Sequence, residues 1–165
     1  MSTSSLVEPI DINDSGYKDY LLSHLTQNFL KAAETGDFDQ VKEYLDNGNN
    51  VNARNVANWT ALHRASRQGH YDIVKLLLEK GADPDIKIHH GHTSIFLATG
   101  LGHTKIVKLL IEYGATINHI RQIEALLKED ITDLNQEAKN KALKYASLNN
   151  FADISKQLFD NGAQM

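Results

Sequence analysis

The chain contains no cysteine among its 165 residues. This absence excludes a disulfide framework, a thiolate nucleophile and a zinc site built on cysteine ligands. Because nothing in the sequence requires an oxidising environment, we expect the protein in a reducing compartment such as the cytoplasm.

Long apolar runs and basic runs are also missing. No segment approaches the roughly 18 consecutive apolar residues that a membrane-spanning helix needs. The opening residues, MSTSSLVEPIDINDSG, lack the basic segment followed by an apolar segment that marks a secretory signal. A net charge of −4 with no basic run argues against nucleic acid as a partner. We therefore expect neither a membrane nor a nucleic acid partner.

The composition is that of one folded domain. Hydrophobic residues make up 41% of the chain and charged residues 23%, which is typical of a soluble globular protein. The length suits a single core. We expect a disordered tail over residues 1–17, a single domain over 18–165, and a monomer.

A 33-residue repeat organises this domain. The segment NWTALHRASRQGHYDIVKLLLEKGAD, from Asn58, matches GHTSIFLATGLGHTKIVKLLIEYGAT, from Gly91, at an offset of 33. A third copy begins at Phe29, and a looser fourth copy begins at Lys141 after an insertion at 121–135. Such a period is the sequence signature of a repeat protein. We place the repeats at about 18–54, 55–87, 88–120 and 136–165.

Each copy has the pattern of two short helices. Thr60 and Thr93 stand where an N-cap is needed. Gly69 and Gly102 follow the first helix, where a left-handed residue ends it. The second helix, as in 73–78, carries apolar residues at helical spacing. Two short helices cannot bury such a face alone, so we expect the copies to stack.

The sequence TALH at 60–63, followed by QGHYDIVKLLLEKGAD at 68–83, resembles the ankyrin repeat, and the period agrees. The resemblance covers roughly residues 27–120 and 136–163. It implies an all-α solenoid of stacked helix-turn-helix units with short β-hairpin fingers. One departure is Phe96, which stands where the motif has histidine. The terminal repeats lack the motif, as expected where one face meets water.

The insertion at 121–135 reads RQIEALLKEDITDLN and consists largely of helix-forming residues. Its apolar residues fall on one helical face: Ile123, Leu126 and Leu127. We expect an extra helix that replaces the last finger, with Thr132 or Asp133 capping the next helix. The alternative is an irregular loop over the whole insertion.

Residues 18–26 precede the first repeat. We expect them to extend or precede its first helix, with Tyr20, Leu21 and Leu25 covering the open end of the core.

The stretch HHGH at 89–92 is the densest group of candidate metal ligands, because imidazole binds metals and titrates near neutral pH. In register with the repeats, however, Gly91 becomes the turn of a finger and the histidines its tip. Adjacent residues of a hairpin point apart, whereas zinc needs three or four converging ligands. A metal-binding or histidine-dependent activity at 89–92 is therefore our second hypothesis.

Other chemistry finds no support in the sequence. The resemblance implies that His63 bonds the Thr60 hydroxyl and nearby backbone, and that His70 and His103 are framework residues. No GxSxG motif occurs, and no Gly-Lys-Ser/Thr follows the glycines at 100–102. We expect no catalytic residue, no metal site, no cofactor and no enzymatic activity.

The family binds other proteins through its finger tips and the concave face of its first helices, and the resemblance transfers this surface position by position. The partner-binding residues it implies are Arg54, Val56, Ala57, Trp59, Arg64, Arg67, Gln68, Lys87, His89, His90, His92, Leu97 and Leu101. This set is basic and aromatic within an acidic chain, and tryptophan beside arginine is enriched in interface hot spots. It would steer an acidic partner. The alternative is that Trp59 packs along its neighbouring finger and binds nothing.

We predict a non-catalytic protein-interaction module, an adaptor or a stoichiometric inhibitor, whose partner has an acidic or apolar surface. A third hypothesis is a scaffold subunit of a larger assembly, docked through 121–135. The frequent Asn, Ile and Lys residues are consistent with an AT-rich genome, and so with a microbial effector in a host cytosol. Asn52 and Asn118 stand where, as the resemblance implies, some eukaryotic members are hydroxylated.

Overall fold

The computed structural model describes residues 14–165, and within this range the regular structure is entirely helical. The helices are α1 (Ser15–Thr35), α2 (Phe38–Asp46), α3 (Ala61–Gln68), α4 (Tyr71–Glu79), α5 (Ser94–Gly100), α6 (Thr104–Glu112), α7 (Ile120–Leu126), α8 (Gln136–Leu148) and α9 (Ala152–Asp160).

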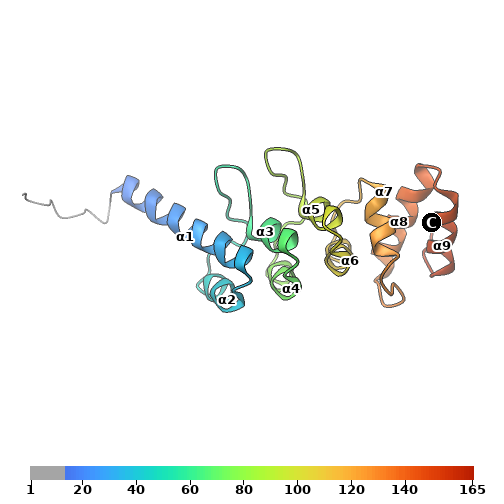
Figure 1. Cartoon of the computed structure of the whole chain (residues 1–165), viewed down its shortest axis with the longest axis horizontal. Coiled ribbons are helices and arrows are strands. Elements are labelled where there is room, and N and C mark those ends of the chain that lie inside the picture. The colour runs from blue at the N-terminus through green and yellow to red at the C-terminus, as the bar shows by residue number, and fades with distance from the viewer. Residues whose placement is uncertain (1–13) are drawn as a thin grey trace, which may run out of the picture.

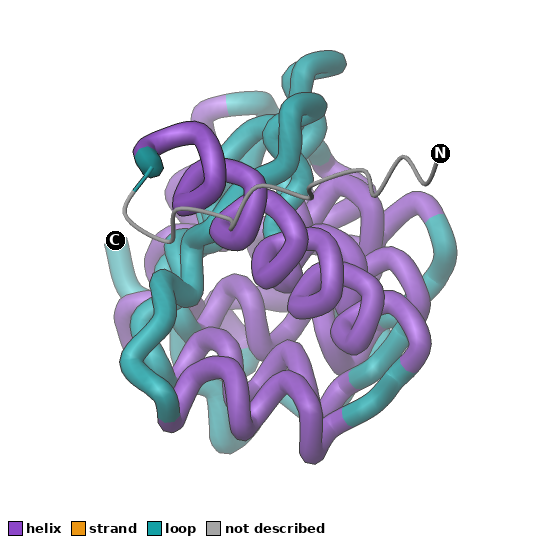
Figure 2. Tube along the Cα trace, turned by 90° about the vertical axis from the view of Figure 1, so that its left-hand side faces the viewer, coloured by secondary structure: helices purple, strands orange, loops and turns teal. Residues whose placement is uncertain are grey.

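The helices stack into an elongated row (Figure 1). Each repeat is an antiparallel pair: α1 with α2, α3 with α4, α5 with α6, and α8 with α9. First helices pack on first helices, α1 on α3 and α3 on α5, while α2, α4 and α6 form the second row. Viewed from its N-terminal end, the row shows its repeats one behind another (Figure 2). The predicted all-α solenoid is confirmed.

Glycines end the first helices because the chain must turn there in the left-handed region. Gly36 and Gly69 have φ of 84° and 83°, which side chains with a Cβ rarely adopt. Space is short as well: a Cβ on Gly69 would lie 2.7 Å from Cε1 of His103 in the next repeat. In the last repeat Asn150 takes this role with φ of 59°, since asparagine tolerates this region better than most residues.

Equivalent positions of the second helices supply the core. Leu45, Leu78 and Ile111 stand one repeat apart and are all buried. Ala65 and Ala98 are also completely buried and let the first helices approach closely. Each large aliphatic side chain buried in this way contributes about 1.5–3 kcal/mol, so stacking rather than helix propensity stabilises the domain.

Two fingers rise on one side of the row, between α2 and α3 and between α4 and α5 (Figure 1). In the second finger the backbone N–H of Ile88 donates to the carbonyl of His92 at 3.0 Å, and Gly91 has φ of 77°. The N–H of His89 reaches the carbonyl of Ala57 in the first finger at 3.4 Å. No strand occurs in residues 14–165, so the fingers are hydrogen-bonded turns rather than the expected β-hairpins.

The insertion forms a helix over its first half only. α7 packs against α5 and α6 where a third finger would otherwise follow. Residues 127–134 then turn back, with Ile131 and Leu134 buried. The next helix, α8, is capped by Asn135, whose Oδ1 accepts the N–H of Ala138 at 2.8 Å. The cap is therefore neither Thr132 nor Asp133, because the chain must first insert Leu134 into the core.

The first helix begins earlier than the sequence predicts. Asp14 caps α1, so residues 15–17, assigned above to a tail, form its first turn; residues 1–13 lie outside the described part of the chain. The side chains expected to cover the core, Tyr20, Leu21 and Leu25, remain 57%, 42% and 47% exposed. They do not cover it because α1 runs on past the end of the stack (Figure 1).

Candidate protein-interaction surface

Trp59 lies at the junction of the first finger and α3. Its ring is half-buried and packs against the core. The guanidinium carbon of Arg64 lies 4.5 Å from the ring centroid and that of Arg67 lies 5.7 Å from it. Arginine over an indole face is a favourable cation–π arrangement. Trp59 is thus neither a free tip residue nor a fully packed one.

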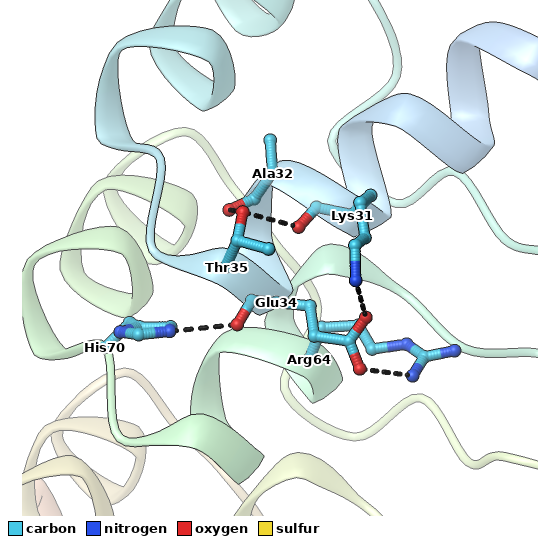
Figure 3. Close-up of polar contacts among 6 residues, drawn as sticks. All are labelled: Lys31, Ala32, Glu34, Thr35, Arg64 and His70. Carbon is cyan, nitrogen blue, oxygen red and sulfur yellow. Dashed lines mark hydrogen bonds and ion pairs between the residues drawn. The ribbon is translucent and has the colours of Figure 1, made fainter.

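Arg64 is held from the other side by the preceding repeat. Its Nη1 lies 3.1 Å from Oε1 of Glu34 on α1, and Lys31 approaches the same carboxylate at 3.4 Å (Figure 3). The backbone carbonyl of Glu34 accepts a hydrogen bond from Nε2 of His70 at 3.0 Å. Arg64 therefore joins two repeats and contacts Trp59 while it is ion-paired with Glu34.

Arg67 differs from Arg64 because no carboxylate in residues 14–165 forms an ion pair with it. Its side chain is exposed one turn further along α3. Its backbone carbonyl accepts a hydrogen bond from Nε2 of His103 at 3.1 Å, and its guanidinium contacts the Trp59 ring. A cation beside an indole, with no internal partner, is available to an acidic group from outside.

The next repeat continues this surface with apolar residues. Leu97 stands at the position of Arg64 and is half-buried, while Leu101 is 56% exposed. Phe96, which is absent from the predicted site, is also exposed and stacks on the ring of His92 at 4.0 Å between centroids. Its signal in the sequence is the replacement of the motif histidine. We call Trp59, Arg64, Arg67, Phe96, Leu97 and Leu101 the concave surface.

The remaining predicted residues lie around it. Five are exposed on the rising fingers: Arg54, Val56, Lys87, His89 and His90. Ala57 is half-buried and gives its carbonyl to the second finger. Gln68 is exposed at the end of α3. The structure thus gathers the first-helix residues into one surface and leaves the tip residues on separate loops.

His63 is a framework residue, as predicted. Its Nδ1 lies 2.8 Å from Oγ1 of Thr60 and accepts the Thr60 N–H at 3.3 Å, while its Nε2 lies 3.0 Å from the carbonyl of Ile86. Burial lowers the pKa of His63 to about 4. The ring is therefore neutral at pH 7, and this pattern assigns its proton to Nε2, which donates to Ile86.

The hydrogen bonds of His63 also explain why the equivalent residue of the third repeat, Phe96, is not a histidine. Ile86 belongs to the finger that follows the second repeat, and the equivalent residue one period later is His119. There the finger is missing: the His119 carbonyl accepts the N–H of Gln122 in α7. A histidine at 96 would find no such partner. The loss leaves the buried Thr93 hydroxyl without a hydrogen-bond partner among the described residues.

The finger-tip histidines do not converge. The rings of His90 and His92 lie 6.4 Å apart between centroids, and His92 is turned onto Phe96. Within residues 14–165, no three His, Asp or Glu side chains are grouped so that they could hold a metal ion. The second hypothesis, a metal or histidine-dependent site at 89–92, gains no geometric support.

The turn after α7 is tied to α6, in the second row of helices. Nζ of Lys108 lies 2.6 Å from Oδ1 of Asp133, which raises the pKa of Lys108, and the Thr104 hydroxyl donates to Glu129. Burial raises the pKa of the nearby Glu112 carboxyl. This side of the insertion is used for attachment to α6, which leaves less of it for docking another subunit.

Comparison with known proteins agrees with this architecture. A family model of ankyrin repeats, in three copies, matches residues 29–121. This is more than half of the chain, and the protein belongs to the ankyrin-repeat family. No curated protein matches the sequence.

Family membership indicates the general kind of activity. Ankyrin repeats generally serve as protein–protein interaction modules and are typically non-catalytic. None of the helices in residues 14–165 is long and apolar enough to cross a membrane.

Proposed function

We propose that the protein is a non-catalytic binding module, an adaptor or a stoichiometric inhibitor, that holds a partner protein against the concave surface. The observation that carries this proposal is Arg67, an exposed cation without an internal ion pair in residues 14–165, beside a tryptophan that is already held in place. The absence of cysteine is compatible with action in a reducing compartment such as the cytoplasm.

The chemistry of the surface favours a partner that presents an acidic and an apolar residue side by side. A carboxylate can make two parallel hydrogen bonds to the Arg67 guanidinium, and the apolar residue would cover Leu97 and Leu101. Because Arg64 already contacts Trp59, binding loses little side-chain freedom there. Tryptophan and arginine are among the residues most enriched in interface hot spots, where one truncation costs about 2 kcal/mol or more.

Charge reversal with a matched control tests the proposal. Wild-type protein, Arg67→Glu and Lys75→Glu would be used for affinity capture from the native source, with mass spectrometry and then calorimetry on the partner found. Lys75 lies exposed on α4, in the second row, so it gives the same charge change on another face. We expect Arg67→Glu to weaken binding about 30-fold or more and Lys75→Glu to leave it unchanged. Equal binding by both variants would show that the concave surface is not the contact.

A further inference from the structure

The first half of α1 extends beyond the stack (Figure 1). We call residues 15–25 the overhang. None of them is buried, and Thr26 is the first buried residue of the helix. Leu22 on this segment is 59% exposed, so the overhang presents large apolar side chains to solvent.

After Lys18 and Asp19, the overhang lacks the charges of an ordinary exposed helix. From Tyr20 to Leu30 there are eleven consecutive residues without Asp, Glu, Lys or Arg, in a chain that is 23% charged. Leu21 and Leu22 both lie next to Leu25 on one side of the helix, because residues three and four apart are neighbours there. The same line continues into Phe29, which stacks on Tyr44 in the core at 3.9 Å. We call these three leucines the leucine ridge.

The rest of the N-terminal end is closed to further stacking. In the second repeat Ile73 is buried and Leu76 is half-buried, whereas the first repeat has Gln40 and Glu43 at these positions, both exposed. These polar side chains give the end a solvated face, as terminal repeats require. The leucine ridge is therefore not part of a surface on which another whole repeat could stack.

We propose that the overhang pairs antiparallel with the overhang of a second copy of this chain. A two-fold axis brings the residues nearest to it close to their own counterparts, so charged residues there would repel one another whereas the uncharged leucines do not. With the axis near Leu21 and Leu22, these leucines cover one another. Lys18 of one copy then lies along Leu25 of the other, where its methylene stem can cover the leucine while its ammonium group stays in water.

The size of the contact predicts a weak dimer. The overhang spans about three helical turns, roughly 16 Å, and buries less than the ~800 Å² per partner of a standard interface. The dimer is therefore expected to dissociate on dilution. This proposal replaces our expectation of a monomer and is independent of the concave surface.

Sedimentation equilibrium of the full chain between about 5 and 500 µM tests self-association, in the concentration range where contacts of this size dissociate. The average mass is expected to rise from one chain toward two. Leu22→Lys places like charges near the axis and is expected to raise the dissociation constant at least about tenfold. Leu148→Lys adds the same charge at a 73% exposed leucine at the other end of the row and should leave it unchanged.

Cross-linking locates the contact, because an introduced cysteine is the only thiol in the chain. Under mild oxidation, Leu21→Cys is expected to form a disulfide-linked dimer faster than Leu148→Cys. A single-chain mass at every concentration, with equal cross-linking rates, would overturn the proposal. A dimer that persists in Leu22→Lys, or one that forms only after residues 1–13 are removed, would overturn it as well.

Discussion

Replacing His63 by phenylalanine, the residue that the third repeat has at this position, is expected to destabilise the domain by about 2–4 kcal/mol. The change removes the contacts of the ring with Thr60 and with the Ile86 carbonyl. Each hydrogen bond contributes about 1 kcal/mol, and a buried carbonyl left without a donor costs about 1–3 kcal/mol. For a domain of this size the melting temperature should fall by about 5–15 °C.

The pH dependence of stability gives a second, sharper measure. Unfolded histidine titrates near 6.5, whereas burial holds the pKa of His63 at about 4 in the fold. Between these values the unfolded chain binds a proton that the native ring does not, so stability falls as pH drops from 6.5 to 4. At about 1.4 kcal/mol per pKa unit the loss approaches about 3 kcal/mol. His63→Phe lacks this contribution, so its stability should change less over the same window.

Urea unfolding followed by circular dichroism at pH 7 and pH 5 measures both effects. The reciprocal variant, Phe96→His, is the control, because the carbonyl it would need is already bonded within α7. We expect Phe96→His to gain less than about 1 kcal/mol. Three results would contradict the role assigned to His63: a cost of His63→Phe under about 0.5 kcal/mol, the same pH dependence in wild type and His63→Phe, or stabilisation by several kcal/mol in Phe96→His.

Three further outcomes are expected. Thermal melts should show that Gly69→Ala lowers the free energy of unfolding by about 1 kcal/mol or more beyond the effect of Gly102→Ala. Both glycines have positive φ, but only a Cβ at Gly69 would meet His103. Equal destabilisation by the two variants would contradict this. Arg64→Ala should shift the Trp59 emission to longer wavelength and make it easier to quench, because it uncovers one face of the ring; unchanged quenching would show that the ring is shielded otherwise. Zinc added after chelation and dialysis should leave the melting temperature unchanged, and a reproducible rise at stoichiometric zinc would restore the metal hypothesis.

Much of the fold was predictable because the repeat encodes it locally. Short-range interactions determine the repeat period, the glycines after the first helices and the TALH motif, so these features can be recognised in the sequence. The end of α7 was not predictable in this way: residues 127–134 contain helix formers, but burial of Ile131 and Leu134 overrides their propensity.

The positions of the candidate surface residues were predictable from the sequence, but the ion pairing of their side chains was not. The register placed Arg64 and Arg67 on the same helix face, and the sequence showed two equivalent cations. Their difference comes from Glu34 in the preceding repeat, which pairs with only one of them. Phe96 is visible in the sequence as a departure, yet the reason for it is the finger missing after the third repeat. Both facts depend on contacts between repeats, which a single repeat sequence does not contain.

The histidines that bond across repeat junctions have a consequence for how the domain opens. His70 ties the second repeat to the first and His103 ties the third to the second, but the equivalent residue of the last repeat is Phe151, which has no donor on its side chain. In a linear array, cooperativity depends on the coupling between neighbours. The first three repeats should therefore open together, and α8 and α9 should open at lower free energy. Amide hydrogen exchange would then divide the row into a cooperative body and a C-terminal unit that unfolds on its own.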